Sequence, residues 1–278
     1  MKSTTPERHI EFEGCQNFRD LGGYRTADGR ATRWRTLFRS GDPSMMTPAD
    51  MDRARALGIS AVLDFRSSAH VSLQTGPLSR EVPRYHPLAL EPQWVDPNLR
   101  GTWLGSSLAY MANSDTQAQL RAAIEALAGD FGLPAVFHCA QGKDRTGLFA
   151  AVVLGCLGVD DSDIAADFAL SAQYFDKEKF AVAVRAFAEL GPAAAELVQR
   201  AGQLATLFPA ANETPAPGPM LAFLDRVRAD YGSVRAYVLG IGVDEECLGR
   251  LEERLLEMAS GGDYPPEGTL RRMPGKEN

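Results

Sequence analysis

Residues 133–159 read LPAVFHCAQGKDRTGLFAAVVLGCLGV and contain the elements that decide the fold. LPAVFH (133–138) is apolar up to its closing histidine and predicts a buried strand. A polar loop with glycine follows, and then TGLFAAVVLGCLGV (146–159), which is almost wholly apolar and predicts a helix inside the protein. A buried strand, a loop and a buried helix in this order are typical of α/β proteins, so the stretch predicts that fold class.

Shorter elements of the same kinds lie on the N-terminal side of this stretch. They are predicted, in order, as glycine-punctuated strands in residues 8–40, a capped helix over 47–58, strands over 59–65 and 82–90, an irregular part over 91–115 and an amphipathic helix over 116–129. Strands that alternate with helices favour parallel pairing. We therefore expect a central, partly parallel sheet flanked by helices.

The chain changes character after Asp160. Residues 160–208 are alanine-rich and helical, a proline-rich connector covers 209–219, and helical patterns resume from 220 to 259. We expect one domain over residues 1–260, because a chain of this length can bury a single large core. The remaining residues, 261–278, are rich in glycine, proline and charge, and we expect them to be disordered.

The composition excludes several classes of protein. The chain has 29 Lys and Arg against 36 Asp and Glu, a net charge of −7, so it is a poor candidate for binding nucleic acid through bulk charge. The N-terminus lacks the apolar core of a secretory signal, and the longest apolar run, 148–157, is far too short to span a membrane. We therefore expect a cytoplasmic protein without stable membrane insertion, and leave open export by a route that needs no recognisable signal.

The four cysteines are widely spaced, and no cysteine or histidine cluster has the spacing of a zinc site. They are Cys15, Cys139, Cys156 and Cys247. We expect free thiols in a reducing compartment, and neither a metal nor another cofactor. Three of the cysteines are expected in the core, whereas Cys139 lies in the polar loop.

The first quarter of the chain is richer in arginine than the rest. The first 70 residues carry eleven Lys and Arg against nine Asp and Glu, so this part could build a local anion site. For Arg33, Arg35 and Arg39 we expect a solvent-exposed strand face. For Arg19 and Asp20 we expect a structural pair.

The loop His138–Gly147 has the features of an anion site. It joins the carboxyl end of a strand to the N-terminus of a helix, which is the usual ligand crevice of an α/β fold. The peptide N–H groups of residues 140–145 can curl toward one point, where the helix adds unpaired donors and the positive end of its dipole. Gly142 lets the backbone turn. We therefore expect the loop backbone, with Ala140, Gln141 and Gly142, to bind a tetrahedral anion.

Cys139 lies at the base of this cradle. A thiol there should ionise easily, because backbone donors and a nearby cation stabilise the thiolate. Arg145 returns to the same point, where its planar fork can hold two oxygens of the anion, and Thr146 can donate its hydroxyl to the sulfur. A thiolate beneath a bound phosphate is an in-line nucleophile, so we expect a cysteinyl-phosphate that water later hydrolyses.

Two carboxyl groups are candidates for protonating the leaving group. Asp144 lies in the loop itself, and Asp64 ends a strand that could emerge at the same edge of the sheet. Either could act as general acid and then as base for water, and Asp64 is equally suited to structural hydrogen bonds with Arg66 under the loop. Lys143 adds a second cation for a further phosphate or carboxylate of the substrate. His138 is expected to hydrogen-bond the loop backbone.

At these residues the chain resembles the cysteine-dependent protein tyrosine phosphatase superfamily, whose signature is Cys, five residues, Arg and then Ser or Thr. The loop is similar, more narrowly, to the bacterial branch with HCxxGKDRTG loops. Other segments match that branch in its order: NFRDLGGY (17–24), LFRSG (37–41), LDFRS (63–67) and YGSVRAYV (231–238). The resemblance covers residues 10–259, and its loop motif is highly specific.

The resemblance implies a role for each loop residue. Cys139 would be the nucleophile and Arg145 the clamp on the phosphate and the transition state. Asp144 is favoured as general acid, because this branch carries an aspartate inside the loop. Residues 160–215 match in position a helical lid that is inserted into the phosphatase domain and covers the active site.

Three functions remain open. The leading one is a phosphomonoester hydrolase, a tyrosine or dual-specificity protein phosphatase. Because Lys143 followed by Asp144 is a feature that this branch shares with phosphoinositide-hydrolysing members, phosphoinositide hydrolysis is the alternative. A phosphate-binding module without catalysis is a third, although the chain has both a nucleophile and an acid. The expected partner is thus a phosphorylated protein or a phosphoinositide, and no nucleic acid.

Overall fold

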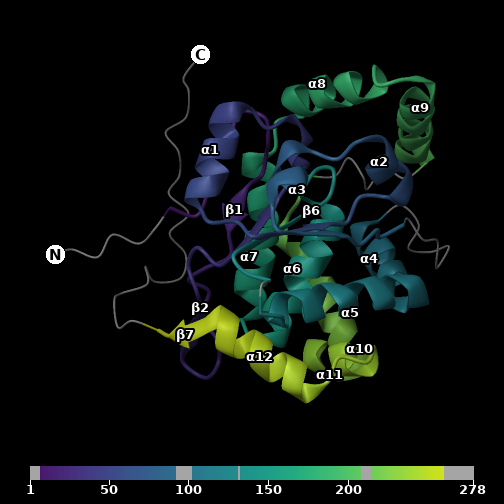
Figure 1. The fold of residues 1–278 in the computed structure, drawn as a ribbon. Coiled ribbons are helices and arrows are strands. Elements are labelled where there is room, and N and C mark those ends of the chain that lie inside the picture. Colours follow the sequence, from purple (N-terminus) through teal and green to yellow (C-terminus); the bar gives the residue numbers. More distant parts are fainter. Residues whose placement is uncertain (1–6, 92–101, 131, 208–213, 260–278) are drawn as a thin grey trace, which may run out of the picture.

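A computed structural model describes residues 7–91, 102–130, 132–207 and 214–259 of the chain (Figure 1). The tail over 261–278, which the sequence predicts to be disordered, lies outside the described residues. No helix within the described residues combines the length and the apolar composition needed to cross a membrane.

A five-stranded sheet forms the centre of the molecule, with the strand order β1-β3-β6-β4-β5. The strands are β1 (Arg19–Asp20), β3 (Leu37–Ser40), β6 (Ala135–His138), β4 (Ala61–Asp64) and β5 (Arg84–Pro87). β3, β6, β4 and β5 run parallel, and β1 is antiparallel to β3. The predicted α/β class with a partly parallel sheet is therefore confirmed.

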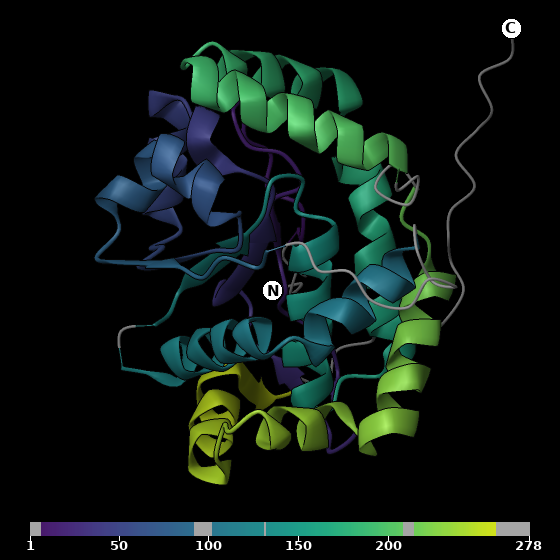
Figure 2. The ribbon, with the colours of Figure 1, turned by 90° about the vertical axis from the view of Figure 1, so that its right-hand side faces the viewer.

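Helices cover both faces of the sheet, because successive side chains of each strand point to opposite faces. Val62 and Val136 pack on the face that carries α1 (Pro48–Ala56) and α3 (Pro77–Glu81). Leu63 and Phe137 pack on the opposite face with the larger group of helices. These are α4 (Trp103–Ala112), α5 (Ser114–Ala128), α6 (Asp144–Cys156), α7 (Asp161–Tyr174), α10 (Pro217–Tyr231), α11 (Val234–Gly240) and α12 (Glu245–Leu255). Figure 2 shows the sheet between the two layers.

α6 is the predicted buried helix, and it lies in the middle of the larger layer. Its apolar side chains from Leu148 to Leu154 are at most 2% exposed, so they contact protein on every side. The helix ends where Gly158 takes a φ of 79°, a left-handed conformation that glycine adopts without strain. The N-terminus of α6 points back to the carboxyl edge of the sheet, where the polar loop lies.

Two parts of the chain differ from the sequence-based expectation. Residues 103–112 form α4 within a stretch expected to be irregular, because Trp103, Ala109 and Met111 are buried in the core and Thr102 caps the helix on the N–H of Gly105. Helical propensity is weak there, and tertiary packing decides the structure. Short helices α2 (Ser68–Leu73) and α3 were likewise not predicted.

The C-terminal helix α12 ends earlier than predicted. Residues Leu256–Met258 form β7, which pairs antiparallel with β2 (Arg30–Thr32) in a separate two-stranded sheet. The end of the described chain is therefore joined to its first strands.

Helices α8 (Lys177–Ala188) and α9 (Pro192–Leu207) form a hairpin that stands apart from both layers, at the top of Figures 1 and 2. The hairpin approaches the rest of the chain at α2, where Phe187 of α8 packs on the His70 ring at a centroid distance of 4.2 Å. α7, by contrast, packs against α6 and α10, and its Asp167 is 1% exposed. The segment predicted as a lid, 160–215, thus contains one buried helix and one peripheral hairpin.

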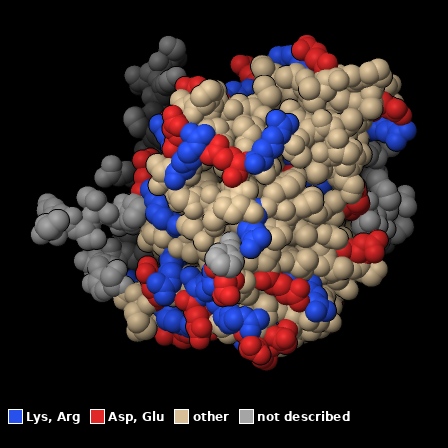
Figure 3. Space-filling view, in the orientation of Figure 1, with Lys and Arg blue, Asp and Glu red and all other residues tan. Residues whose placement is uncertain are grey.

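Acidic and basic side chains alternate on the surface around α1 and α12, as Figure 3 shows for one face. Many of them pair, such as Arg235 with Glu245 at 2.6 Å and with Glu252 at 2.7 Å. The charged groups of these helices therefore balance one another at short range.

Candidate active site

The register of the sheet brings the chemistry-bearing segments to one edge. His138 lies opposite Ser40 of β3 on one side and Asp64 of β4 on the other. All three end parallel strands, so the residues that follow them leave the sheet together. Cys139 follows the central strand, and it is 3% exposed.

The carbonyl groups of the loop are held from outside. The N–H of Asp42 donates to Ala140 O at 3.0 Å. The side-chain amide of Asn17 donates to Gln141 O at 3.1 Å and to Gly142 O at 3.0 Å, and Arg39 donates to Gly142 O at 2.9 Å. In a trans peptide the C=O and the following N–H point in opposite directions. Because three successive carbonyls point outward, the three following N–H groups point into the loop.

Gly142 is required by both conformation and space. Its φ is 68°, and a Cβ at this position would lie 2.5 Å from backbone atoms of Ser40 and Gly41. An L-residue would therefore be strained and would also collide with the end of β3.

Arg145 is fixed over the loop by the other neighbouring strand. Its guanidinium donates to Phe65 O at 2.9 Å, in the residue after β4. Burial lowers the pKa of this guanidinium, but the negative charge that Cys139, Tyr110 and Asp144 can carry outweighs burial and raises the pKa above its usual value. Among these three groups, Cys139 has the largest influence on the pKa of Arg145.

The hydroxyl of Thr146 does not make the expected bond to the sulfur. Thr146 is fully buried at the first turn of α6, and its Oγ1 has no hydrogen-bond partner among the described residues. The structure shows Thr146 buried beside the loop and without a hydrogen bond to Cys139.

Lys143 and Asp144 lie at the mouth of the loop. The Lys143 side chain is 9% exposed and its ammonium is 3.6 Å from the Asp144 carboxylate, which is 37% exposed. They line a narrow pocket together with Trp103 of α4, Phe168 of α7 and four residues before and within α10, namely Thr214, Pro215, Ala216 and Pro219. The cavity measures about 10 Å³, which is close to the space that a single water needs.

Asp64 lies under the loop and is engaged there. It is fully buried, accepts hydrogen bonds from Arg66 at 2.6 Å and from the Tyr85 hydroxyl at 2.9 Å, and lies 3.6 Å from His138 Nε2. Burial raises the pKa of this carboxyl, but His138 and Arg66 outweigh burial and lower it. The carboxylate is therefore ionised near neutral pH and poorly suited to donate a proton.

His138 is buried beside Asp64, and its Nδ1 lies 3.3 Å from the Cys139 carbonyl. Burial is the largest influence on its pKa and lowers it, partly offset by Asp64. The imidazole is therefore neutral near neutral pH, and its charge acts on Asp64 only at acid pH, where the carboxyl titrates.

Of the three arginines expected on a solvent-exposed face, Arg33 and Arg35 have side chains that are 42% and 41% exposed, whereas Arg39 does not lie on such a face. Arg39 is fully buried, because β3 lies between β1 and β6 and its guanidinium pairs with Asp167 at 2.6 Å. Arg19 pairs with Asp167 at 2.9 Å and not with Asp20. Asp20 instead accepts from the N–H groups of Gly22 and Arg35, both at 2.8 Å. The expectations for Arg39 and for the pair of Arg19 with Asp20 were wrong, because Asp167, the partner of both arginines, is 128 or more residues away in the sequence.

Sequence reasoning missed the aromatic side chains around the pocket. Trp103 packs against Phe168 at a centroid distance of 4.6 Å with the ring planes tilted by 43°, and its Nε1 is buried without a hydrogen-bond partner among the described residues. Tyr110 faces the loop from the same helix, and its pKa is raised to about 12, chiefly by burial, while Arg145 lowers it. The sequence gives no signal for these aromatic side chains, because the polar residues around them have an irregular spacing.

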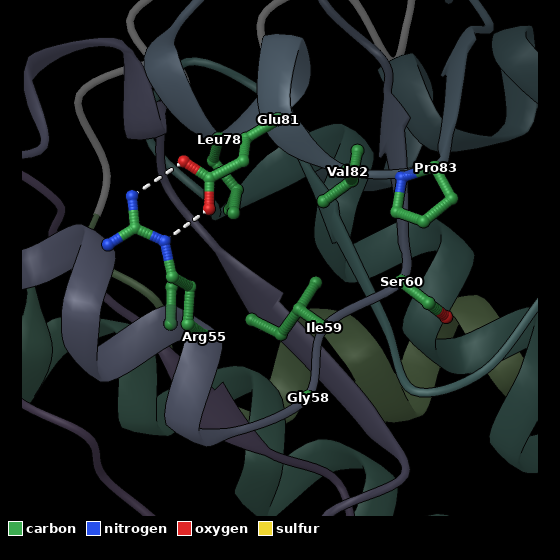
Figure 4. A pocket seen from close by; sticks show the side chains of 9 residues that line it. Arg55, Gly58, Ile59, Ser60, Leu78, Glu81, Val82 and Pro83 are labelled. Atoms are coloured by element: carbon green, nitrogen blue, oxygen red, sulfur yellow. Dashed lines mark hydrogen bonds and ion pairs between the residues drawn. The ribbon is translucent and has the colours of Figure 1, made fainter.

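A second pocket lies at the opposite end of β4. It is lined by Gly58, Ile59 and Ser60 before the strand and by Leu78 and Val82 of the α3 region. Figure 4 shows its rim, where Arg55 pairs with Glu81. Because the loop leaves the carboxyl edge of the sheet, this pocket has no part in the site. No cluster of His, Cys, Asp and Glu suited to a metal occurs within the part of the chain that the structure describes.

Comparison with known proteins agrees with this geometry. A family model described as "Tyrosine phosphatase family" matches residues 10–257. The chain is 35% identical over 185 residues to a putative tyrosine-protein phosphatase of Cupriavidus necator, an alignment that covers 60% of this chain and 64% of that protein.

Two further relatives are aligned over more of the chain. A tyrosine-protein phosphatase of Nostoc commune is 28% identical over 78% of this chain and 73% of its own length. The triple specificity protein phosphatase PtpB of Mycobacterium tuberculosis is 27% identical over 88% of this chain and 98% of its own length.

Proposed function

The chain belongs to the tyrosine phosphatase family, and on that premise we propose that it hydrolyses phosphomonoesters of proteins through a cysteinyl-phosphate intermediate. Tyrosine is the main target in this proposal, and serine and threonine are further targets. The observation that carries the proposal is the loop itself. Cys139 lies at its base, successive amides point inward and Arg145 is held above by Phe65 O.

The reaction runs in two steps. The Cys139 thiolate attacks phosphorus, the bond from phosphorus to the ester oxygen breaks, and that oxygen takes a proton from Asp144. Water then attacks the cysteinyl-phosphate while Asp144 accepts its proton, and inorganic phosphate and the thiolate are released. Loop amides and Arg145 stabilise the charge on the three phosphoryl oxygens in both transition states.

Asp144 is preferred over Asp64 as the acid. Asp144 is partly exposed at the mouth of the loop, where a leaving group would stand. Asp64 is fully buried, bound by Arg66 and Tyr85, and its pKa is lowered. A carboxyl that is ionised and enclosed cannot protonate an ester oxygen in the pocket.

The pocket supports an aromatic substrate. Trp103 and Phe168 supply flat apolar walls beside Lys143 and Asp144, which suits a phenyl ring whose phosphate enters the loop. Since the cavity holds about one water, the walls of this pocket open to admit a substrate in this proposal. We take the α8–α9 hairpin, rather than α7, as the movable part of the 160–215 lid.

Phosphoinositide hydrolysis is not favoured by the comparisons, since the printed names of all three relatives are those of protein phosphatases. The buried ammonium of Lys143 is the feature that would serve it. No feature of the site as described favours a phosphate-binding module without catalysis. The cytoplasm suits the proposed mechanism, because thiols stay reduced there and all four cysteines are free.

The test is phosphate release from a phosphotyrosine peptide, a phosphoserine peptide and a soluble monophosphorylated inositide, without added metal. We expect the tyrosine peptide to react fastest. Cys139→Ser should reduce turnover by about 10⁴-fold or more, because the nucleophile is lost. Turnover retained by this variant would contradict the covalent mechanism, and a preference for the inositide would move the function to lipids.

The acid is tested with esters of different leaving groups. Asp144→Asn should slow phenyl phosphate by about 10²-fold and p-nitrophenyl phosphate much less, since a good leaving group needs no proton. Asp64→Asn is the matched control and should slow both esters equally. A leaving-group dependence in the control instead would assign the acid to Asp64.

A further inference from the structure

The buried arginine behind the loop does more than fill the core. We propose that Arg39, with Asn17 beside it, is a positioning residue for phosphate binding: it holds the Gly142 carbonyl outward and so turns the N–H of Lys143 into the cradle. The inference rests on the proposed function and deepens it, because it assigns the shape of the cradle to side chains outside the loop.

The contacts of the Gly142 carbonyl carry the argument. Arg39 donates to it at 2.9 Å and the Asn17 amide at 3.0 Å, so both lone pairs of this oxygen are engaged. Asn17 also donates to Gln141 O at 3.1 Å, which fixes the preceding peptide in the same sense. Without these donors the two carbonyls could rotate toward the anion and repel it.

Arginine is suited to this place because its fork reaches two targets at once. One end donates to Gly142 O, while the other pairs with Asp167 of α7 at 2.6 Å. Asp167 is itself held by Arg19 at 2.9 Å and by the Tyr24 hydroxyl at 3.0 Å. The guanidinium is therefore fixed in its plane, and a lysine could satisfy Asp167 but could not reach both targets.

Both members of the pair are charged at neutral pH. Burial and the nearby Arg19 lower the pKa of Arg39 to about 10, which still leaves it protonated. Burial raises the pKa of Asp167, but Arg19 and Arg39 outweigh burial and hold it below its usual value. The bond to Gly142 O is thus a charge-assisted one, stronger than a bond between neutral groups.

The other buried arginine of the site provides a matched control. Arg66 is also fully buried and also pairs with carboxylates, Asp64 and Asp42, but it donates no hydrogen bond to a carbonyl of residues 139–143. Arg66→Lys and Arg39→Lys are therefore equal in burial and in charge. They differ in the bond to the loop.

The experiment measures phosphate binding without turnover. Full-length protein is treated with iodoacetamide at rising concentrations of inorganic phosphate, and alkylation of Cys139 is followed by mass spectrometry. We expect phosphate to protect the wild type, Arg39→Lys to weaken its binding about tenfold, and Arg66→Lys to change it less than about twofold. Thermal unfolding shows whether each variant is folded.

A second variant keeps the test open if the lysine variants do not fold. Asn17 has a φ of 57°, so Asn17→Gly suits the backbone and keeps every charge. It removes the side-chain amide, which donates to the loop and also accepts a hydrogen bond from Arg19. It should weaken phosphate by several-fold. Equal phosphate affinity in the wild type and in a folded Arg39→Lys or Asn17→Gly would overturn the inference alone. Absence of phosphate protection in the wild type would overturn the proposed function and the inference together.

Discussion

Two buried clusters of arginine and aspartate flank the phosphate loop, one under each neighbouring strand. The Arg66 cluster contains Asp42, Asp64 and Arg66, one cation with two carboxylates. The Asp167 cluster contains Arg19, Arg39 and Asp167, two cations with one carboxylate. The Arg66 cluster therefore carries an excess negative charge, and the Asp167 cluster carries an excess positive charge.

The clusters also touch the loop differently. The Arg66 cluster reaches it through backbone groups, the N–H of Asp42 and the carbonyl of Phe65, which precedes Arg66. The Asp167 cluster reaches it through the Arg39 side chain, on the side of Gly142. Its excess positive charge lies in a low-dielectric interior beside the place of a bound phosphate, where it favours the anion. Backbone groups next to the Arg66 cluster therefore hold the loop, whereas the Asp167 cluster holds it through a charged side chain.

The largest effect should come from breaking the charge balance of the Asp167 cluster. Asp167→Asn leaves two buried arginines without a carboxylate and should lower the free energy of unfolding by about 3–5 kcal/mol. Asp64→Asn leaves Arg66 paired with Asp42 at 2.8 Å, so we expect a smaller loss, about 1–3 kcal/mol. Urea denaturation measures both. Equal losses would mean that the difference in charge between the two clusters does not affect the free energy of unfolding.

A second effect should follow from the residue that the Asp167 cluster holds. Gly142→Ala places a Cβ 2.5 Å from backbone atoms and should lower kcat/KM by about 10²-fold, because the loop amides are displaced. Gly58→Ala is the control, since its φ is 70° but a Cβ there meets no atom within 4 Å. Similar kinetics for both variants would contradict the role given to the close packing of Gly142 against the end of β3.

The smallest effect concerns the folding stability of the protein at acid pH. The carboxyl of Asp167 has a folded pKa below its unfolded value of about 3.9, so it contributes stability above that pH and loses it as the pH falls. Between pH 5 and pH 3 the wild type should therefore lose about 1 kcal/mol more than Asp167→Asn. Thermal unfolding across this range checks the difference. Parallel curves for the two proteins would contradict the assignment of an ionised carboxylate.

The same comparison shows what the sequence can predict. Asp64 and Arg66 are two residues apart at the end of a recognisable strand, so their structural pairing was among the expectations. Arg39 and Asp167 are 128 residues apart, and no local pattern links them. Their pairing follows from the strand order, which places β3 inside the sheet, and from the packing of α7 on α6.

In the rest of the fold and the site, too, local features could be predicted from the sequence and features that depend on distant residues could not. The loop from His138 to Gly147 is contiguous, so its shape and place at the sheet edge could be predicted from its own residues. The walls contributed by Trp103 and Tyr110 could not, because α4 forms through burial rather than through propensity. Thr146 shows the limit within the loop itself, since its hydroxyl does not reach the sulfur.

The order in which the ribosome makes these residues has a consequence for the newborn chain. At about 5–20 residues per second, Asp167 follows Arg39 by roughly 6–26 s. During that interval Arg19 and Arg39 lack the carboxylate that allows their burial, and for roughly the last 1–6 s of it Cys139 has already been synthesised. The nucleophile thus emerges before its surroundings can assemble, and a nascent chain that stops short of α7 contains the signature motif without a formed anion site.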